Sequence, residues 1–231
     1  MTKLPIYIGI VVGFALSLVY VIGRKTKPNA LDLVMKTIAS LAITATMISA
    51  IAITAQPQIT EGFALGALLC LLGDILLEMR YLHKDYSDKL LRSGVLSFMF
   101  AHFLYSDAII HEADIIKLPT MSASALIAVS VGLGAWLLEK PLSLDYDKFK
   151  VIIPIYGGIS TLTATTSLWA IMAEPSIAHI VRFIGAIMFL ISDMVLAFIY
   201  FRKGKDKKSY NVANGILYFS AQCLIALSLV I

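Results

Sequence analysis

The sequence predicts an all-α membrane protein, a polytopic bundle of eight transmembrane helices that forms a single integral membrane domain over residues 1–231. Composition is the first observation behind this fold class. Hydrophobic residues make up 59% of the chain and charged residues 15%, whereas soluble chains average roughly 45–50% and about 25%. Because the surface of a soluble globule of this size must be largely polar, the composition excludes a soluble enzyme.

Eight apolar stretches are the second observation, because a bilayer span takes roughly 20 mostly apolar residues. They cover residues 4–23, 33–55, 62–79, 93–111, 119–138, 149–172, 177–201 and 210–231. The connections between them are too short to hold a soluble domain. Gly23-Arg24-Lys25 follows the first stretch as a basic flank without a small-residue cleavage site, so we expect a retained helix.

The distribution of Lys and Arg is the third observation. Most of the 19 basic residues fall in the connections that follow the first, third, fifth and seventh stretches. The positive-inside rule therefore predicts that these connections face the cytoplasm and that both termini lie outside. The net charge of +4 then indicates loops that face anionic lipid, and we expect no nucleic-acid partner.

A faint internal repeat divides the chain into residues 1–115 and 116–231. The repeat rests on three matches in the same order: residues 71–77 with 190–196, Lys27-Pro28 with Lys140-Pro141, and residues 94–98 with 215–219. Their nearly constant offset favours a duplication of four helices. An even number of spans in each unit makes the two repeats parallel. Chance similarity among apolar helices is the alternative.

Two acidic residues lie at bilayer depth, where an ionisable side chain costs a few kcal/mol and indicates function. Asp74 and Asp193 are expected ~8 Å and ~12 Å inside the cytoplasmic ends of the third and seventh stretches, at 1.5 Å per residue. Each follows a small residue, Gly73 or Ser192, which allows neighbouring helices to approach closely. We predict that the two carboxylates share one site. Two separate carboxylates, each hydrogen-bonded for packing, are the alternative.

Uncharged polar residues at similar depth are further candidates for this site. His102 lies about ten residues into the fourth stretch, so ~15 Å deep, within reach of Tyr105 and the two acids. A packing histidine is the alternative. Tyr218 and Gln222 share a face of the eighth stretch. Such groups usually bridge helices by hydrogen bonds, and binding of a polar substrate is their other role.

Charged residues near the cytoplasmic boundary form a second group of candidates. Asp32 and Lys36 have the i, i+4 spacing of a local ion pair, and lining of a pocket by Lys36 is the alternative. Glu78 lies one turn beyond Asp74, and we expect it to be solvated. Lys27 is placed to contact lipid phosphate, as basic residues at this boundary do.

Several other chemistries lack the residues they need. A zinc site takes about three converging ligands. His83 falls in a cytoplasmic loop and His111 and His179 at the opposite boundary, so they cannot converge with His102. Neither a Gly-x-Ser-x-Gly motif nor a phosphate-cradling Gly loop occurs. We therefore expect neither a metal nor an organic cofactor.

An ordered set of motifs runs through most of the chain. Its anchors are Thr26-Lys27-Pro28, Gly73-Asp74 with Leu77, Gly94, Phe98, His102 and Tyr105, Ser192-Asp193, and Tyr218 with Gln222. With these motifs the chain resembles the YhhN-like family of eight-span membrane proteins, whose characterised members are lysoplasmalogenases. The resemblance implies hydrolysis of the vinyl ether bond of lysoplasmalogens, a class of lysophospholipid. The products are a fatty aldehyde and glycerophosphoethanolamine or glycerophosphocholine.

The resemblance also implies site residues and a location. The paired aspartates of the family correspond to Asp74 and Asp193 as catalytic residues, and the Tyr and Gln of the last span correspond to Tyr218 and Gln222. The location is the cell membrane in a prokaryote and the endoplasmic reticulum membrane in a eukaryote. We expect the lysolipid to enter from the inner leaflet with its head group toward Lys27, Lys36 or the loop cations.

The chemistry of vinyl ether hydrolysis agrees with two buried carboxyl groups. Protonation of the β-carbon gives an oxocarbenium ion, water adds, and the hemiacetal collapses to an aldehyde. Burial beside a second carboxylate favours the protonated acid that the first step needs. An ionised partner stabilises the cation and takes a proton from water, as in glycosidases. Deeper burial favours the neutral form, so Asp193 is the preferred acid.

Two other function classes also use paired membrane aspartates. A proton-coupled transporter or lipid-translocating protein fits parallel repeats and intramembrane acids, and Pro154 with Gly157-Gly158 is a place where the sixth stretch would break. An intramembrane aspartyl protease carries a Gly-x-Gly-Asp motif. Here Leu71 occupies the first Gly position, which disfavours the protease.

Overall fold

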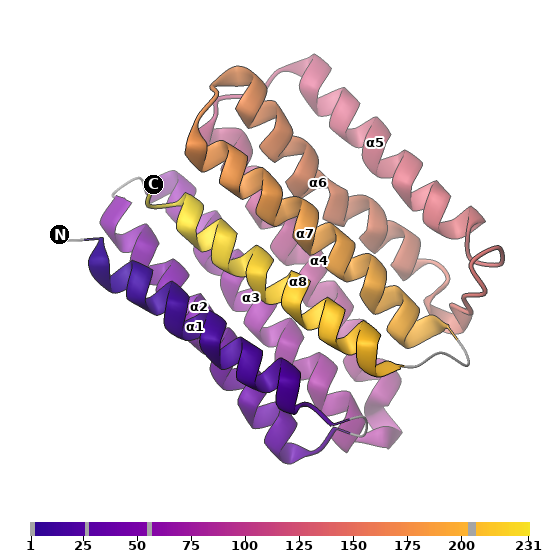
Figure 1. The fold of residues 1–231 in the computed structure, drawn as a ribbon. Helices are drawn as coiled ribbons and strands as arrows, with labels where there is room; N and C mark the ends of the chain where they lie inside the picture. The colour runs from indigo at the N-terminus through magenta and orange to yellow at the C-terminus, as the bar shows by residue number, and fades with distance from the viewer. Residues whose placement is uncertain (1–2, 26–27, 55–56, 203–206) are drawn as a thin grey trace.

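The computed structural model describes residues 3–25, 28–54, 57–202 and 207–231. Within these ranges the chain forms a bundle of eight long α-helices (Figure 1). They are α1 (Leu4–Gly23), α2 (Ala30–Thr54), α3 (Pro57–Leu82), α4 (Ser87–Glu112), α5 (Leu118–Leu137), α6 (Ile152–Ala173), α7 (Ile177–Phe201) and α8 (Lys207–Ser228). Each helix overlaps one predicted stretch, so the all-α, eight-helix prediction is confirmed.

Six of the eight helices, α1 to α5 and α7, are long and apolar enough to cross a membrane. Of the other two, α6 is rich in Gly, Ser and Thr, and α8 begins with Lys, Ser and Asn residues. Polar side chains of both helices contact neighbouring helices, as Thr163 of α6 and Tyr218 of α8 do. Membrane crossing by α6 and α8 therefore stays a prediction that rests on their place in the bundle.

The helices pack as a ring with one member outside it. Around the ring the order is α1, α2, α3, α4, α6, α7 and α8, and α8 closes it by packing on α1. Helix α5 packs mainly on α6 and lies at the edge of the bundle (Figure 1). Apolar side chains such as Val11, Leu126 and Ile177 are exposed on the outer faces, as expected for a surface in contact with lipid.

Both ends of the chain lie at the same end of the bundle (Figure 1). We call the opposite end, where α1, α3 and α7 end and α2, α4 and α8 begin, the basic end. Its described basic residues include Arg24, Lys25, Arg80, Lys84, Lys89, Arg92, Lys148, Lys150 and Arg202. The sorting of basic residues to one end agrees with the sequence pattern, while the cytoplasmic orientation of that end stays a prediction.

Two predictions about organisation are not tested by the arrangement of the helices. They are the single domain over residues 1–231 and the repeats over 1–115 and 116–231. The pairs α3–α4 and α7–α8, which correspond in the predicted repeats, are the two most extensive helix pairings. In contrast, α1 belongs to the ring whereas its counterpart α5 lies outside it.

Small residues before the two aspartates bring helices together, as expected. A Cβ atom added to Gly73 would lie 2.6 Å from Cε2 of Phe98 on α4, so only glycine allows this approach of α3 to α4. Ser192 is buried, and its Oγ accepts a hydrogen bond of 2.8 Å from Nδ2 of Asn214 on α8. These two contacts fix the helix segments that carry Asp74 and Asp193.

Candidate functional site

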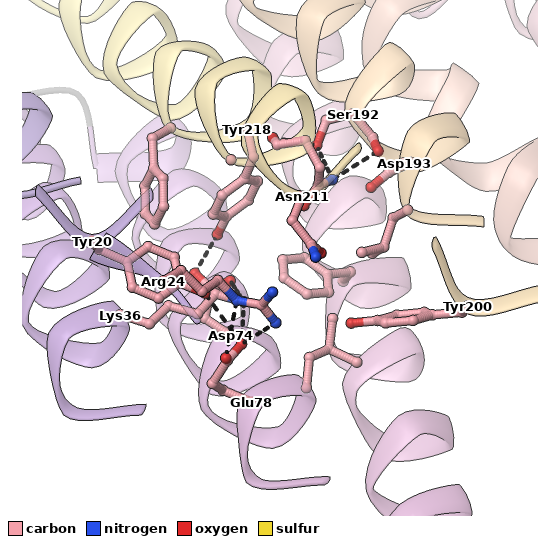
Figure 2. A pocket seen from close by; sticks show the side chains of 16 residues that line it. Tyr20, Arg24, Lys36, Asp74, Glu78, Ser192, Asp193, Tyr200, Asn211 and Tyr218 are labelled. Carbon is pink, nitrogen blue, oxygen red and sulfur yellow. Dashed lines mark hydrogen bonds and ion pairs between the residues drawn. The ribbon is translucent and has the colours of Figure 1, made fainter. Parts of the chain in front are cut away.

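A polar pocket lies between α3, α7, α8 and the adjoining parts of α1 and α2, in the half of the bundle nearer the basic end. Asp74 and Asp193 line it from opposite sides (Figure 2). The space open to the centre of a water molecule is about 40 Å³, and roughly 10–15 Å³ is enough for one water. The pocket that both carboxyl groups line therefore has room for water.

Asp74 is a buried carboxylate with a full set of donors. Its side chain is 2% exposed. Nζ of Lys36 lies 3.1 Å from Oδ1, and the hydroxyls of Ser40 and Tyr218 each donate to Oδ2 at 2.6 Å. One ammonium and two hydroxyl donors are partners that suit an anion.

Glu78 forms a second charged contact set one turn nearer the basic end. Its carboxylate accepts hydrogen bonds of 3.2 Å from both Nε of Arg24 and the Tyr20 hydroxyl, and Lys36 Nζ lies 3.8 Å away. Glu78 is only 2% exposed, so the expectation of a solvated residue was wrong. A cation from α1 and another from α2 compensate its charge and allow its burial.

Lys36 does not form the expected local pair with Asp32. The Asp32 carboxylate, in the first turn of α2, instead accepts the backbone N–H groups of Lys25 and Asn29, which precede the helix. The contact with Asn29 is that of the third residue of a capping box. Lys36 turns toward α3 and lines the pocket. The alternative reading of Lys36 as a pocket residue is the one that agrees with the structure.

Asp193 has a different set of partners from Asp74. Its side chain is 9% exposed, and Oδ2 lies 3.2 Å from Nε2 of His102 on α4. The other ring nitrogen, Nδ1, lies 3.0 Å from Oγ1 of Thr163 on α6. Among the described residues no Lys or Arg forms an ion pair with Asp193. The two aspartates thus face one pocket, but only Asp74 has a lysine.

Tyr105 and Gln222 stand behind the pocket in a chain of hydrogen bonds. The Tyr105 hydroxyl donates to Oε1 of Gln222 at 3.3 Å, and Nε2 of Gln222 donates to the Tyr218 hydroxyl at 3.4 Å. Tyr218 in turn donates to Asp74. Both residues therefore connect to the site through Tyr218.

The predicted substrate-binding residues fall into three groups. Lys36 and Tyr218 line the pocket with the two aspartates. His102, Tyr105 and Gln222 are joined to it by hydrogen bonds from the second layer of side chains. Lys27 lies outside the described residues.

An aromatic cluster lies between the partners of the two aspartates. The ring of Phe189 is 5.3 Å from that of Tyr218 and 4.4 Å from that of His102, measured between centroids. Phe98 packs on both Phe189 and Tyr218. The site thus combines two carboxyl groups with an apolar wall.

Three residues of the site were not predicted from the sequence to belong to it. They are Tyr20, Arg24 and Ser40. Tyr20 and Arg24 have i, i+4 spacing, as do Lys36 and Ser40. This spacing puts both members of a pair on one helix face. A search for polar i, i+4 pairs inside apolar helices would have found them.

Comparison with known protein families gives a match over most of the chain. The sequence profile of the YhhN family matches residues 31–229, a range that includes both aspartates, Lys36, His102 and Tyr218. No curated protein and no solved structure matches the chain. Within the described ranges, no group of three or more His, Cys, Asp or Glu side chains is arranged to hold a metal ion.

Proposed function

The chain belongs to the YhhN family, and on this premise we propose that it is an intramembrane lysoplasmalogenase. The family includes lysoplasmalogenases. The proposed reaction hydrolyses the vinyl ether bond of a lysoplasmalogen to a fatty aldehyde and glycerophosphoethanolamine or glycerophosphocholine. The observation that carries the proposal is one water-sized pocket faced by two aspartates with unlike partners.

The unlike partners assign the two roles. Asp74 has an ammonium and two hydroxyl donors, so we assign it the ionised role. Asp193 has a histidine and no described lysine or arginine, so we assign it the acid. This assignment separates the protonation states of two carboxyl groups, as oxocarbenium chemistry requires.

His102 is placed to accept a hydrogen bond from Asp193 in its proposed acid form. Nδ1 of His102 lies 3.0 Å from Oγ1 of Thr163, whose hydroxyl donates to the backbone carbonyl of His102 at 3.2 Å. We therefore assign the tautomer in which Nδ1 carries the proton and donates to Thr163. In this tautomer Nε2 carries no proton and accepts one from the Asp193 carboxyl group. The contact of Oδ2 with Nε2 of His102 fixes the position of the Asp193 carboxyl group, which lines the pocket.

The proposed steps conserve atoms and protons. Asp193 gives its proton to the β-carbon of the vinyl ether, and the oxocarbenium ion forms opposite the Asp74 carboxylate. Water adds to the cation and loses a proton to Asp74, which gives a hemiacetal. Asp193 then takes the hemiacetal hydroxyl proton while Asp74 returns its proton to the glyceryl oxygen. The C–O bond breaks, and both carboxyl groups regain their starting states.

The direct test of the proposal is aldehyde release by the purified protein. We expect the protein in lipid nanodiscs to convert a 1-alkenyl lysophosphatidylethanolamine to fatty aldehyde. The matched 1-acyl lysophosphatidylethanolamine, which has an ester in place of the vinyl ether, is expected to stay intact. Absence of aldehyde over an empty-nanodisc control would overturn the proposal.

One structural feature bears on the rival reading of a transporter. The sequence allowed a break in α6 at Pro154 and Gly157-Gly158, and broken helices are common at transporter binding sites. Helix α6 is instead continuous over Ile152–Ala173. Pro154 lies in its first turn, where proline is tolerated. The continuous helix removes one of the features that would have favoured transport.

A further inference from the structure

Arg80 on α3 has an unusual environment at the basic end. Its guanidinium carbon lies 4.2 Å from the ring centroid of Tyr200 and 5.2 Å from that of Tyr81. Tyr200 itself lines the pocket between the two aspartates (Figure 2). Two nitrogens of Arg80, Nε and Nη1, are buried and have no hydrogen-bond partner among the described residues.

The two cations that line the pocket are already paired, whereas Arg80 lies behind its wall residue Tyr200. Lys36 pairs with Asp74 and Arg24 pairs with Glu78. In the described part of the chain Arg80 forms no ion pair with a carboxylate, and stacking on tyrosine rings replaces only part of a lost hydration shell. Buried donors without acceptors are costly. Arg80 therefore has unused capacity to bind an anion next to the pocket.

We propose that Arg80, beside Tyr200, binds the phosphate of the substrate head group. This inference rests on the proposed function and names the part of the lysolipid that the site recognises. With Asp193 in its acid form, the charges of Lys36 and Arg24 balance those of Asp74 and Glu78. Arg80 is then the charge left to match the single negative charge of a phosphodiester, the type of anion that guanidinium groups bind well.

The position of Arg80 along α3 agrees with the dimensions of a lysoplasmalogen. It lies six residues beyond Asp74, so ~9 Å nearer the basic end at 1.5 Å per residue. Seven bonds separate the phosphorus from the β-carbon of the vinyl ether, about 8 Å at the ~1.2 Å per bond of an extended chain. A phosphate held at Arg80 would place the reacting carbon at the level of the aspartates.

The test compares two substrates that differ only in the phosphate. One is 1-alkenyl lysophosphatidylethanolamine and the other is the 1-alkenyl glycerol with the same chain. For Arg80→Gln we expect kcat/KM on the phosphorylated substrate to fall about tenfold or more, mainly through KM, since hydrogen bonds to charged groups have this effect. The value on the alkenyl glycerol stays unchanged, and Arg80→Lys retains part of the preference.

Arg92→Gln is the matched control, because Arg92 also lies at the basic end over an aromatic ring, that of Phe149, but is exposed. It should leave both substrates unaffected. Equal losses on both substrates in Arg80→Gln would show a structural role and overturn the inference. Unchanged kinetics on both substrates would overturn it as well.

A binding assay separates this inference from the proposed function. We expect the non-hydrolysed 1-acyl lysophosphatidylethanolamine to raise the melting temperature of the wild-type protein more than the monoacylglycerol does, and Arg80→Gln to abolish the difference. This result supports phosphate recognition even if no aldehyde is ever released. Equal, Arg80-dependent stabilisation by inorganic phosphate alone would indicate a free-phosphate site and contradict the lipid assignment.

Discussion

Nε2 of His102 lies 3.2 Å from Oδ2 of Asp193, although their helices α4 and α7 are separated by α6 in the ring. The partner of Asp193 is therefore an imidazole, which can be neutral, whereas the partner of Asp74 is the ammonium group of Lys36. The histidine beside one carboxyl group and the lysine beside the other make the site asymmetric. The proposed division of work between acid and anion depends on this asymmetry.

Replacing His102 should impair acid catalysis by Asp193 without impairing substrate binding. For His102→Leu we expect kcat to fall at least tenfold with little change in KM, because the group that orients Asp193 and accepts its hydrogen bond is lost. His102→Gln keeps a hydrogen-bonding group and should retain more activity. The measurement is the pH–rate profile, whose alkaline limb should move in His102→Leu. A profile identical to that of the wild type would contradict this role.

The hydroxyl group of Tyr218 should contribute to activity. Tyr218→Phe removes the 2.6 Å hydrogen bond to Asp74 and the acceptor of Gln222. We expect about 1–3 kcal/mol lower stability, since a buried acceptor loses its donor, and about tenfold lower kcat. Tyr210→Phe is the control, because Tyr210 stacks on Phe198 away from Asp74. Wild-type turnover by Tyr218→Phe would contradict the role of its hydroxyl.

The pair of Lys36 and Asp74 should show strong coupling in stability. Lys36→Met leaves a buried carboxylate without its cation, and loss of one partner of a buried pair costs about 3–5 kcal/mol. The double variant Lys36→Met with Asp74→Asn removes both charges and should recover much of that loss. Thermal unfolding of the two single variants and the double variant measures the coupling. Additive effects would mean that the two side chains do not interact.

The order of the helices along the chain was predictable, and their extent largely so. The predicted stretch 177–201 coincides with α7, whereas α4 begins at Ser87, before the predicted stretch 93–111. Its first turns are polar, so hydropathy marks the apolar segment and not the end of the helix. The place of α5 outside the ring was not predictable, because an apolar helix that faces lipid and one that faces protein have similar compositions.

The two aspartates of the pocket were predictable from the sequence, whereas the ion pairs around them were not. Asp74 and Asp193 are conspicuous because charges are rare at bilayer depth. Glu78 and Arg24 lie near helix ends, where charged residues are normally solvated, and their contact spans 54 positions of the chain. Only the packing of α1 against its neighbours brings them together. The same holds for Lys36, whose nearby partner Asp32 is used to start α2.

The most direct test of the central claim is aldehyde release from lysoplasmalogen by Asp193→Asn. Asp107→Asn is the control, since Asp107 has a side chain 54% exposed on α4. We predict that Asp193→Asn loses at least about 100-fold in kcat, the lower range for loss of a general acid, while it binds 1-acyl lysophosphatidylethanolamine like the wild type. The control should keep full activity. Wild-type aldehyde release by Asp193→Asn would contradict the account.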